Sequence, residues 1–141
     1  MKKLLIFLLI VPFFALCQET PKGVNTISVQ PITFDQLVTA ILAKNIIIEK
    51  KDIQDKTIVT EFVSDKGFAY RLYIRVNDSS AFITGQLKLT YSMKFLNATS
   101  DPNKTYPIEN RGMKGSELRK AWGKMEEFAR TIPGLISFSK S

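Results

Sequence analysis

The stretch TIVTEFVSDKGFAYRLYIRVNDSSAFITGQLKLTYSMKFL, residues 57–96, decides the fold. Apolar and polar residues alternate along it, which is the pattern of strands with one buried face. The apolar positions are Phe68, Tyr70, Leu72, Ile74 and Val76 in one run and Leu87, Leu89, Tyr91, Met93 and Phe95 in the next. Polar turn residues separate the runs. We predict an antiparallel meander of strands at 57–63, 68–76 and 81–96, with a bulge or bend at Gly85.

Two helices are predicted to flank this meander. Thr33 and Gln36 form a capping box that starts the first helix, and Asn45 ends it. Ser116 caps the second helix, which stops before Pro133. Each helix has one apolar stripe. The stripes consist of Phe34, Leu37, Val38, Ile41 and Leu42 in the first helix, and of Leu118, Trp122, Met125, Phe128, Ala129 and Ile132 in the second.

The remaining segments complete the predicted order. Residues 26–30 are a short strand, and residues 46–48 open another because consecutive β-branched residues suit a pleated surface. Residues 97–115 form a long polar connection. Gly123 marks a close contact, since glycine inside a helix costs about 1 kcal/mol relative to alanine. The last apolar residues fold back onto the domain: Leu135, Ile136 and Phe138.

These elements define an α+β fold class. The predicted order is strand-helix-strand-strand-strand-strand-helix, and short turns between consecutive strands favour an antiparallel sheet. The sheet has one apolar face and each helix has one apolar stripe. We therefore predict a four- to five-stranded antiparallel sheet with both helices packed on one face.

The first seventeen residues have the pattern of a secretory signal peptide. Lys2 and Lys3 precede an apolar run that is shorter than the roughly 20 residues needed to span a bilayer. We predict cleavage after Cys17, with Gln18 as the new N-terminus. Residues 18–31 then form a lead, flexible up to Asn25, and the short strand. Residues 32–141 form a single α+β domain.

The alternative is a lipoprotein in which Cys17 is kept and acylated. Leu16 argues against this alternative, because a small residue normally precedes a lipidated cysteine. Cleavage after Cys17 predicts a secreted or periplasmic protein, whereas retention of Cys17 predicts a lipoprotein anchored at that residue. The membrane contacts it only through the signal segment or through a lipid at Cys17.

The composition excludes several kinds of chemistry. The sequence has no histidine and its single cysteine is Cys17, so the commonest general base, thiol catalysis and zinc sites of Cys or His are not available. Its seven glycines are scattered, without a phosphate-binding loop. Glu126 and Glu127 point about 100° apart on a helix, and the acids of residues 49–56 lack the spacing of a calcium loop. We expect no enzyme activity, no cofactor and no metal.

The positive charge is concentrated in the C-terminal part of the chain. The net charge is +7, and removing Lys2 and Lys3 leaves +5. Residues 18–87 carry eight basic and eight acidic groups, whereas residues 88–141 carry ten basic and five acidic groups. The imbalance indicates either an ordinary solvated surface or attraction to an anionic partner, such as lipid headgroups, a glycan or an acidic envelope protein.

Two groups of residues are candidates for an anionic-partner surface. The first combines basic and aromatic side chains on the polar sheet face: Arg71, Tyr73, Arg75, Lys88 and Lys94, beside Phe82 and Gln86. The second surrounds the start of the last helix: Arg111, Lys114, Arg119, Lys120 and Lys124. Basic and aromatic groups also form nucleic-acid surfaces, but a signal peptide directs the chain away from cytosolic nucleic acid. The alternative for both groups is a solvated face.

The runs TFDQLVTAILAKNIIIEKKDIQDKTIVTEFV, residues 33–63, and YRLYIRVNDSSAFITG, residues 70–85, carry a resemblance. They resemble a domain-of-unknown-function family of small secreted Gram-negative proteins with a TATA-box-binding-protein-like fold. More loosely, they are similar to the repeated domain of the lipoprotein in the outer-membrane β-barrel assembly machine. The shared pattern ends in Ile74-Arg75-Val76-Asn77-Asp78 and covers under half of the chain. The resemblance implies a helix-packed, curved antiparallel sheet in an envelope protein, and no site residue.

The sequence therefore predicts a non-enzymatic binding or scaffold module of the bacterial cell envelope. The alternative is a small carrier that holds a lipid or another hydrophobic ligand between the sheet and the helices. A carrier requires an apolar cavity beneath Trp122 and Phe128, whereas a scaffold requires a filled core there.

Overall fold

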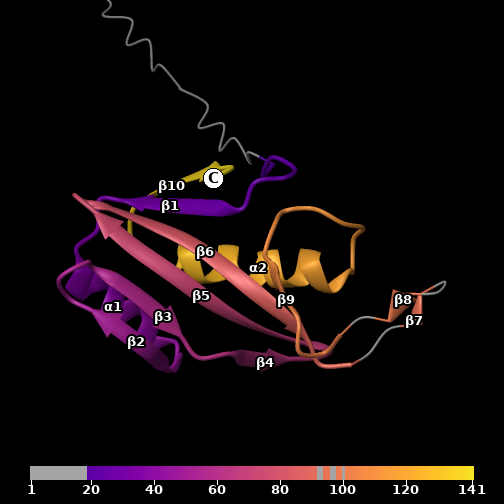
Figure 1. Ribbon diagram of the computed structural model, residues 1–141. Helices are drawn as coiled ribbons and strands as arrows, with labels where there is room; N and C mark the ends of the chain where they lie inside the picture. The colour runs from indigo at the N-terminus through magenta and orange to yellow at the C-terminus, as the bar shows by residue number, and fades with distance from the viewer. Residues whose placement is uncertain (1–18, 92–93, 96–97, 100) are drawn as a thin grey trace, which may run out of the picture.

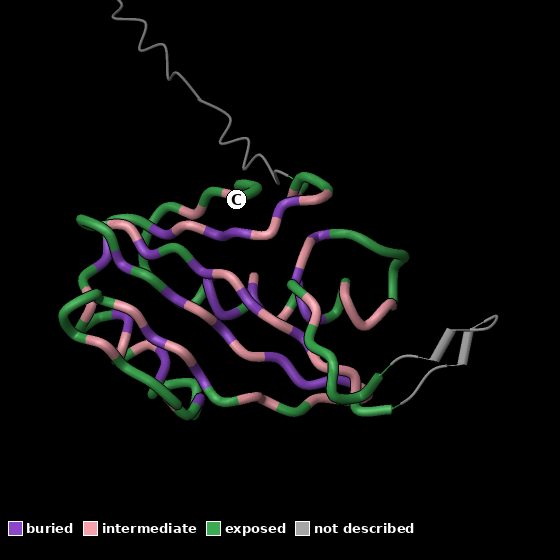
Figure 2. Tube along the Cα trace, in the orientation of Figure 1, coloured by how far each residue is buried: buried purple, intermediate pink, exposed green. Residues whose placement is uncertain are grey.

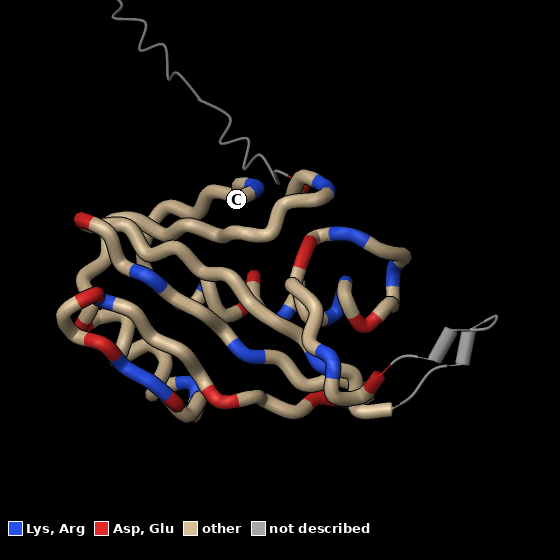
Figure 3. Tube along the Cα trace, viewed as in Figure 1, with Lys and Arg blue, Asp and Glu red and all other residues tan. Residues whose placement is uncertain are grey.

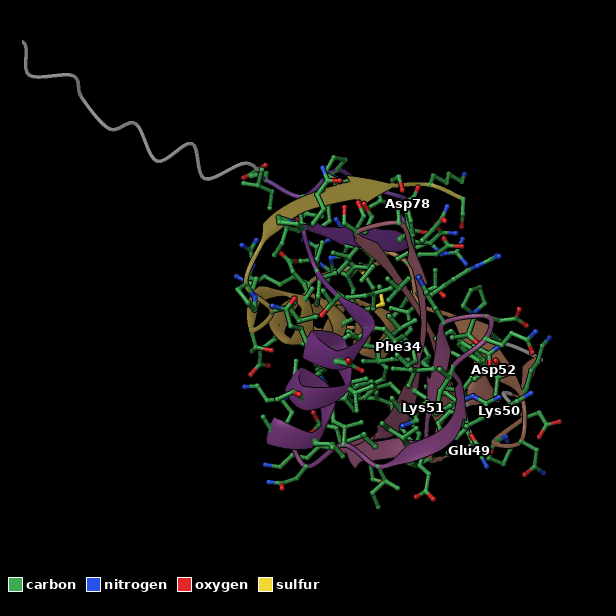
Figure 4. All side chains as sticks on the ribbon, turned by 90° about the vertical axis from the view of Figure 1, so that its left-hand side faces the viewer. Phe34, Glu49, Lys50, Lys51, Asp52 and Asp78 are labelled. Atoms are coloured by element: carbon green, nitrogen blue, oxygen red, sulfur yellow. The ribbon has the colours of Figure 1, made fainter. Side chains whose placement is uncertain are left out.

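The computed structural model describes residues 19–141 except 92–93, 96–97 and 100, and describes no side chains in 92–100. It contains an eight-stranded antiparallel sheet and two helices, which lie on the same face of the sheet (Figures 1 and 4). The elements are β1 (Thr26–Gln30), α1 (Phe34–Ala43), β2 (Ile48–Asp52), β3 (Thr57–Thr60), β4 (Val63–Asp65), β5 (Phe68–Asn77), β6 (Ser80–Leu89), β7 (Lys94–Phe95), β8 (Ala98–Thr99), β9 (Thr105–Pro107), α2 (Glu117–Arg130) and β10 (Leu135–Ser139). The predicted α+β class is confirmed.

The sheet is built outward from the hairpin of β5 and β6. Its order is β10-β1-β6-β5-β3-β2. Two short strands extend this order: β4 pairs with the start of β5, and β9 pairs with the end of β6. The remaining strands, β7 and β8, form a separate two-stranded sheet. The predicted strand at 57–63 is therefore two strands, β3 and β4, that pair with different parts of β5.

The structure has more sheet strands than the four or five predicted. The additional ones, β4, β9 and β10, have three to five residues each. Such short segments show little alternation of their own. β4 is a strand because it forms a tight hairpin with the start of β5, whereas β9 and β10 are strands because they pair with the distant β6 and β1. The predicted strand at 81–96 ends at Leu89 in the structure. Of the predicted apolar run there, the Met93 and Phe95 side chains lie outside the described residues.

Hydrophobic burial follows the predicted alternation in the central hairpin. The predicted apolar residues of β5 are all at most 8% exposed. They belong to a core that also contains Leu37 and Ile41 of α1 and Trp122 and Met125 of α2. Figure 2 shows the buried segments along the central strands in purple. Leu42 was predicted to belong to the same stripe, but it is 58% exposed. Phe34 and Val38, which precede Leu42 on the same row of the helix, are only partly buried, so this row lies at the margin of the buried stripe formed by Leu37 and Ile41.

Both predicted helix starts are confirmed. Thr33 accepts a hydrogen bond from the Gln36 backbone N–H, and the Gln36 side chain accepts one from the Thr33 N–H. Ser116 accepts a hydrogen bond from the Arg119 N–H at the start of α2. Asn45 follows α1 in a left-handed conformation with φ 54°. These local hydrogen bonds involve groups a few residues apart, which is why the sequence pattern predicts them.

Gly85 is required for close packing and not for a bulge. The β5–β6 register is continuous, with Leu72 opposite Gly85, so of the predicted bulge or bend the bulge is absent. A Cβ at Gly85 would lie 2.7 Å from Ile108 Cδ1 and 3.3 Å from Met125 Sδ. The missing side chain allows the helix α2 and the segment after β9 to approach the middle of β6.

Gly123, in contrast to Gly85, is not in close contact with other parts of the protein. A Cβ at this position would meet no atom within 4 Å, so the close contact predicted there is absent. Gly123 is exposed in the interior of α2, where alanine is the better helix former because it loses less backbone entropy.

Substitutions at these two glycines are expected to change stability in opposite directions. Gly85→Val overpacks the contact with Ile108 and is expected to lower the free energy of unfolding by about 1–3 kcal/mol. Gly123→Ala is expected to raise it by about 0.5–1 kcal/mol. Urea denaturation measures both, and equal effects of the two substitutions would contradict the packing described here.

Candidate functional site

A groove of about 570 Å³ lies between the end of β6, strand β9 and the start of α2. Its apolar lining comes from three separate parts of the chain: Leu87, Leu89, Tyr106, Met113 and Leu118. Arg111, Lys114 and Glu117 add charged groups. The volume falls in the range of small-molecule sites, which are mostly apolar with a few polar groups.

Strand pairing and one loop build the groove. Tyr106 of β9 lies opposite Leu87 of β6, so both side chains occupy the same sheet face. Residues 111–116 then lead into α2, where Leu118 enters the groove from the first turn. Gly112 has φ 94° in this loop, and a Cβ there would lie 2.7 Å from Ser116 Oγ. Glycine thus permits the loop to curve tightly around the cap of α2.

The charged residues around the groove differ in whether they form ion pairs. Arg111 Nε lies 2.9 Å from Glu109 Oε2, and Glu117 pairs with Lys120 at 3.4 Å. No ion pair joins Lys114 to any residue that the structure describes. Lys114 therefore supplies the groove with an exposed cation that is free to pair with an anion.

Tyr91 contacts Glu117, one of the residues that line the groove. The Tyr91 hydroxyl donates a hydrogen bond to Glu117 Oε1 at 3.1 Å, close to Gly67. Partial burial, followed by the Glu117 carboxylate, raises the pKa of Tyr91 above its ordinary value. The hydroxyl therefore stays protonated, and it holds the Glu117 carboxylate together with Lys120.

On the helix-free face of the sheet, Arg71, Tyr73 and Gln86 form a cluster. The guanidinium lies 4.7 Å from the Phe62 ring centroid and 5.1 Å from that of Tyr73. Gln86 Oε1 accepts hydrogen bonds from Arg71 Nη2 at 3.2 Å and from the Tyr73 hydroxyl at 2.9 Å. Arg71 also pairs with Glu49 at 3.3 Å. The structure thus brings these predicted residues together, but the acid offsets the charge of Arg71.

The other predicted basic residues are spread over the molecule (Figure 3). Arg75 and Lys88 lie on the same sheet face as Arg71, on β5 and β6. On α2, Lys120 pairs with Glu117, and Lys124 pairs with Asp65 at 3.3 Å. Lys94 belongs to β7, and its side chain lies outside the described residues. Of the second predicted group, Arg111 and Lys114 line the groove.

The Asp65–Lys124 pair joins β4 to α2. The Lys66 backbone N–H and then the Lys124 ammonium hold the pKa of Asp65 below its ordinary value. The same hydrogen bond and charge raise the pKa of Lys124. The spacing of charged residues in the sequence indicates ion pairs only within one helix. It therefore could not predict the ion pair between Lys124 and Asp65, which lie on different elements.

Asn110 is a buried residue that the sequence analysis did not single out. Its side-chain amide donates to the carbonyl oxygens of Thr20 at 3.0 Å and Pro21 at 2.7 Å. Its Oδ1 accepts a hydrogen bond from Arg119. Gly23 donates to the Asn110 carbonyl at 2.8 Å. The described part of the lead is therefore bound to the domain and not flexible as predicted, and Arg119 is engaged internally.

No protein-family model and no curated protein matches the chain. Within the described ranges, no helix is long and apolar enough to cross a membrane. The same residues contain no group of three or more acids that could hold a metal ion. The predicted cleavage between Cys17 and Gln18 lies outside the described residues.

Removing the Asn110 amide is expected to release the lead. Asn110→Ala leaves the Thr20 and Pro21 carbonyls without their buried donor, at a cost of about 1–3 kcal/mol in unfolding free energy. Limited proteolysis should then cut around Lys22 faster than in the unmodified protein. Asn103→Ala, in an exposed turn, is the matched control. Unchanged proteolysis at Lys22 in Asn110→Ala would show that these hydrogen bonds do not hold the lead.

Proposed function

We propose that the protein is a secreted or periplasmic, non-enzymatic binding module of the bacterial cell envelope, and that its ligand is an anionic amphiphile. The apolar groove beside Lys114 is the observation that carries this proposal. The N-terminal sequence pattern supports the envelope location.

The size and lining of the groove favour a ligand with one apolar chain. The lining residues Leu87, Leu89 and Leu118 are provided by rigid elements, β6 and α2, so the space exists without a ligand. Met113 is 83% exposed in the adjoining loop. Methionine is flexible and polarizable, and its side chain suits apolar chains of variable shape.

The charges favour an anionic end on that ligand. Lys114 is an exposed cation at the groove, and Arg111 lies three residues before it. The first turn of α2 adds backbone N–H groups that lack partners within the helix, and such N–H groups favour anions. The negative charge of Glu117 would repel an anion, but its carboxylate forms an ion pair with Lys120 and accepts a hydrogen bond from the Tyr91 hydroxyl.

The packing between the sheet and α2 favours a surface groove over an enclosed carrier. Trp122 and Phe128 are 2% and 4% exposed and belong to the hydrophobic core. The Trp122 ring centroid lies 6.1 Å from that of Phe138, so side chains occupy the position where a carrier would hold its ligand. The groove lies at the other end of the sheet, around β9.

Isothermal titration with sodium dodecanoate, below its micelle concentration, tests the proposal. Lys114→Glu is expected to weaken binding about fivefold, which corresponds to roughly 1 kcal/mol. Lys50→Glu makes the same charge change on β2 and should bind as the unmodified protein does. Dodecanol, which lacks the anionic end, should bind more weakly and show no difference between the two variants.

Two results would contradict the proposal. The first is the absence of saturable binding of dodecanoate. The second is equal weakening by Lys114→Glu and Lys50→Glu, which would indicate attraction by overall charge without a specific groove.

A further inference from the structure

The two edges of the sheet are built differently. The β2 edge carries the charged residues Glu49, Lys50, Lys51 and Asp52, and its pairing with β3 shifts register between Ile48 and Lys50 (Figure 4). Charges and bulges of this kind prevent an edge strand from pairing with another chain. The β10 edge has no such protection, because the sequence has no charged residue and no proline between Gly134 and Ser139. We propose that β10 pairs antiparallel with β10 of a second copy.

The backbone of β10 has groups available for this pairing. The Ser139 carbonyl is directed toward β1, because it accepts a hydrogen bond from the Asn25 N–H at 3.1 Å. Backbone groups of successive residues in a strand alternate between its two sides. Ile136 and Phe138 therefore direct their N–H and C=O groups away from β1. No strand within the described residues pairs with this side of β10.

The sequence of β10 fixes a symmetric register. If Ser137 lies on the twofold axis, Ile136 of each copy is opposite Phe138 of the other, and these residues exchange backbone hydrogen bonds. Both side chains are on the helix-covered face and are only half-buried in one copy. Pairing would complete their burial and extend the apolar layer through both copies.

A second copy fits this edge because the strand is complementary to itself. An uncharged strand pairs with its own copy without placing like charges opposite each other. Across the axis, Ile136 lies opposite Phe138 of the other copy. Glu19 and Pro21 of the lead line the same space as these two residues. Leu135, which is 75% exposed, lies opposite Ser139 on the other face. The resulting interface is one strand wide, so the dimer is expected to form reversibly with protein concentration.

Cysteine cross-linking tests the register directly. The mature chain that the signal-peptide pattern predicts, residues 18–141, lacks Cys17, the one cysteine of the sequence, so in this chain a single new cysteine reports only on the interface. In Ser137→Cys, the two sulfurs meet across a non-hydrogen-bonded pair with Cα atoms about 4.5 Å apart, which suits a disulfide. In Ser139→Cys the two Cα atoms are about 13 Å apart, too far to bridge. We expect mild oxidation to link Ser137→Cys into dimers and to leave Ser139→Cys monomeric.

Sedimentation equilibrium of variants without new cysteines gives the second measurement. Ser137→Lys places two cations opposite each other at the axis and should weaken dimerisation about tenfold. Gln54→Lys adds the same charge in an exposed turn beside β2 and should leave dimerisation unchanged. Circular dichroism melting confirms that both variants fold. The proposal is overturned if the unmodified protein is monomeric up to millimolar concentration, or if both cysteine variants cross-link equally.

Discussion

The ten-residue pairing of β5 with β6 is the interaction on which the rest of the structure depends. It places the apolar series of both strands on one face, and that face supplies the surface on which α2 packs. β6 also pairs with β1 at one end and with β9 at the other. Gly85 lies in the middle of β6, where the absence of a side chain lets Met125 and Ile108 come close. A one-residue shift in the register of one of these strands would turn the buried side chains of that strand toward the opposite face of the sheet.

Sequence reasoning succeeded where the decisive contacts are local or periodic. The capping groups of Thr33 and Ser116 and the alternation along β5 all depend on residues near each other in the chain. It failed where a distant partner decides the outcome. Ser137 is part of a strand because β1, more than a hundred positions earlier, pairs with it. The predicted contact at Gly123 is absent, and of the bulge or bend predicted at Gly85 the bulge is absent, because glycine alone does not indicate which atoms surround it.

The candidate site could be predicted only in part for the same reason. The sequence indicated that basic residues near the start of α2 matter, and Arg111 and Lys114 do line the groove. It could not separate them from Lys120 and Lys124, whose acid partners become apparent only in the structure. The alternation of apolar and polar residues predicted that the Leu87 side chain lies on the buried face of the sheet. Only the pairing of Leu87 with Tyr106 shows that it lines a groove. The lead, which Asn110 holds on the domain, shows the same dependence on distant contacts.

A two-dimensional amide NMR titration with sodium dodecanoate shows whether the groove at the start of α2 is the binding site, because it reports where on the molecule the ligand binds. We expect the largest chemical-shift changes at Leu87, Leu89 and residues 113–118, with little change on the helix-free face around Tyr73. Changes concentrated at Trp122 and Phe128 would show that the ligand enters between sheet and helix. Changes concentrated around Arg71 and Tyr73 would place the binding surface on the opposite face of the sheet. Either of these results would contradict the account.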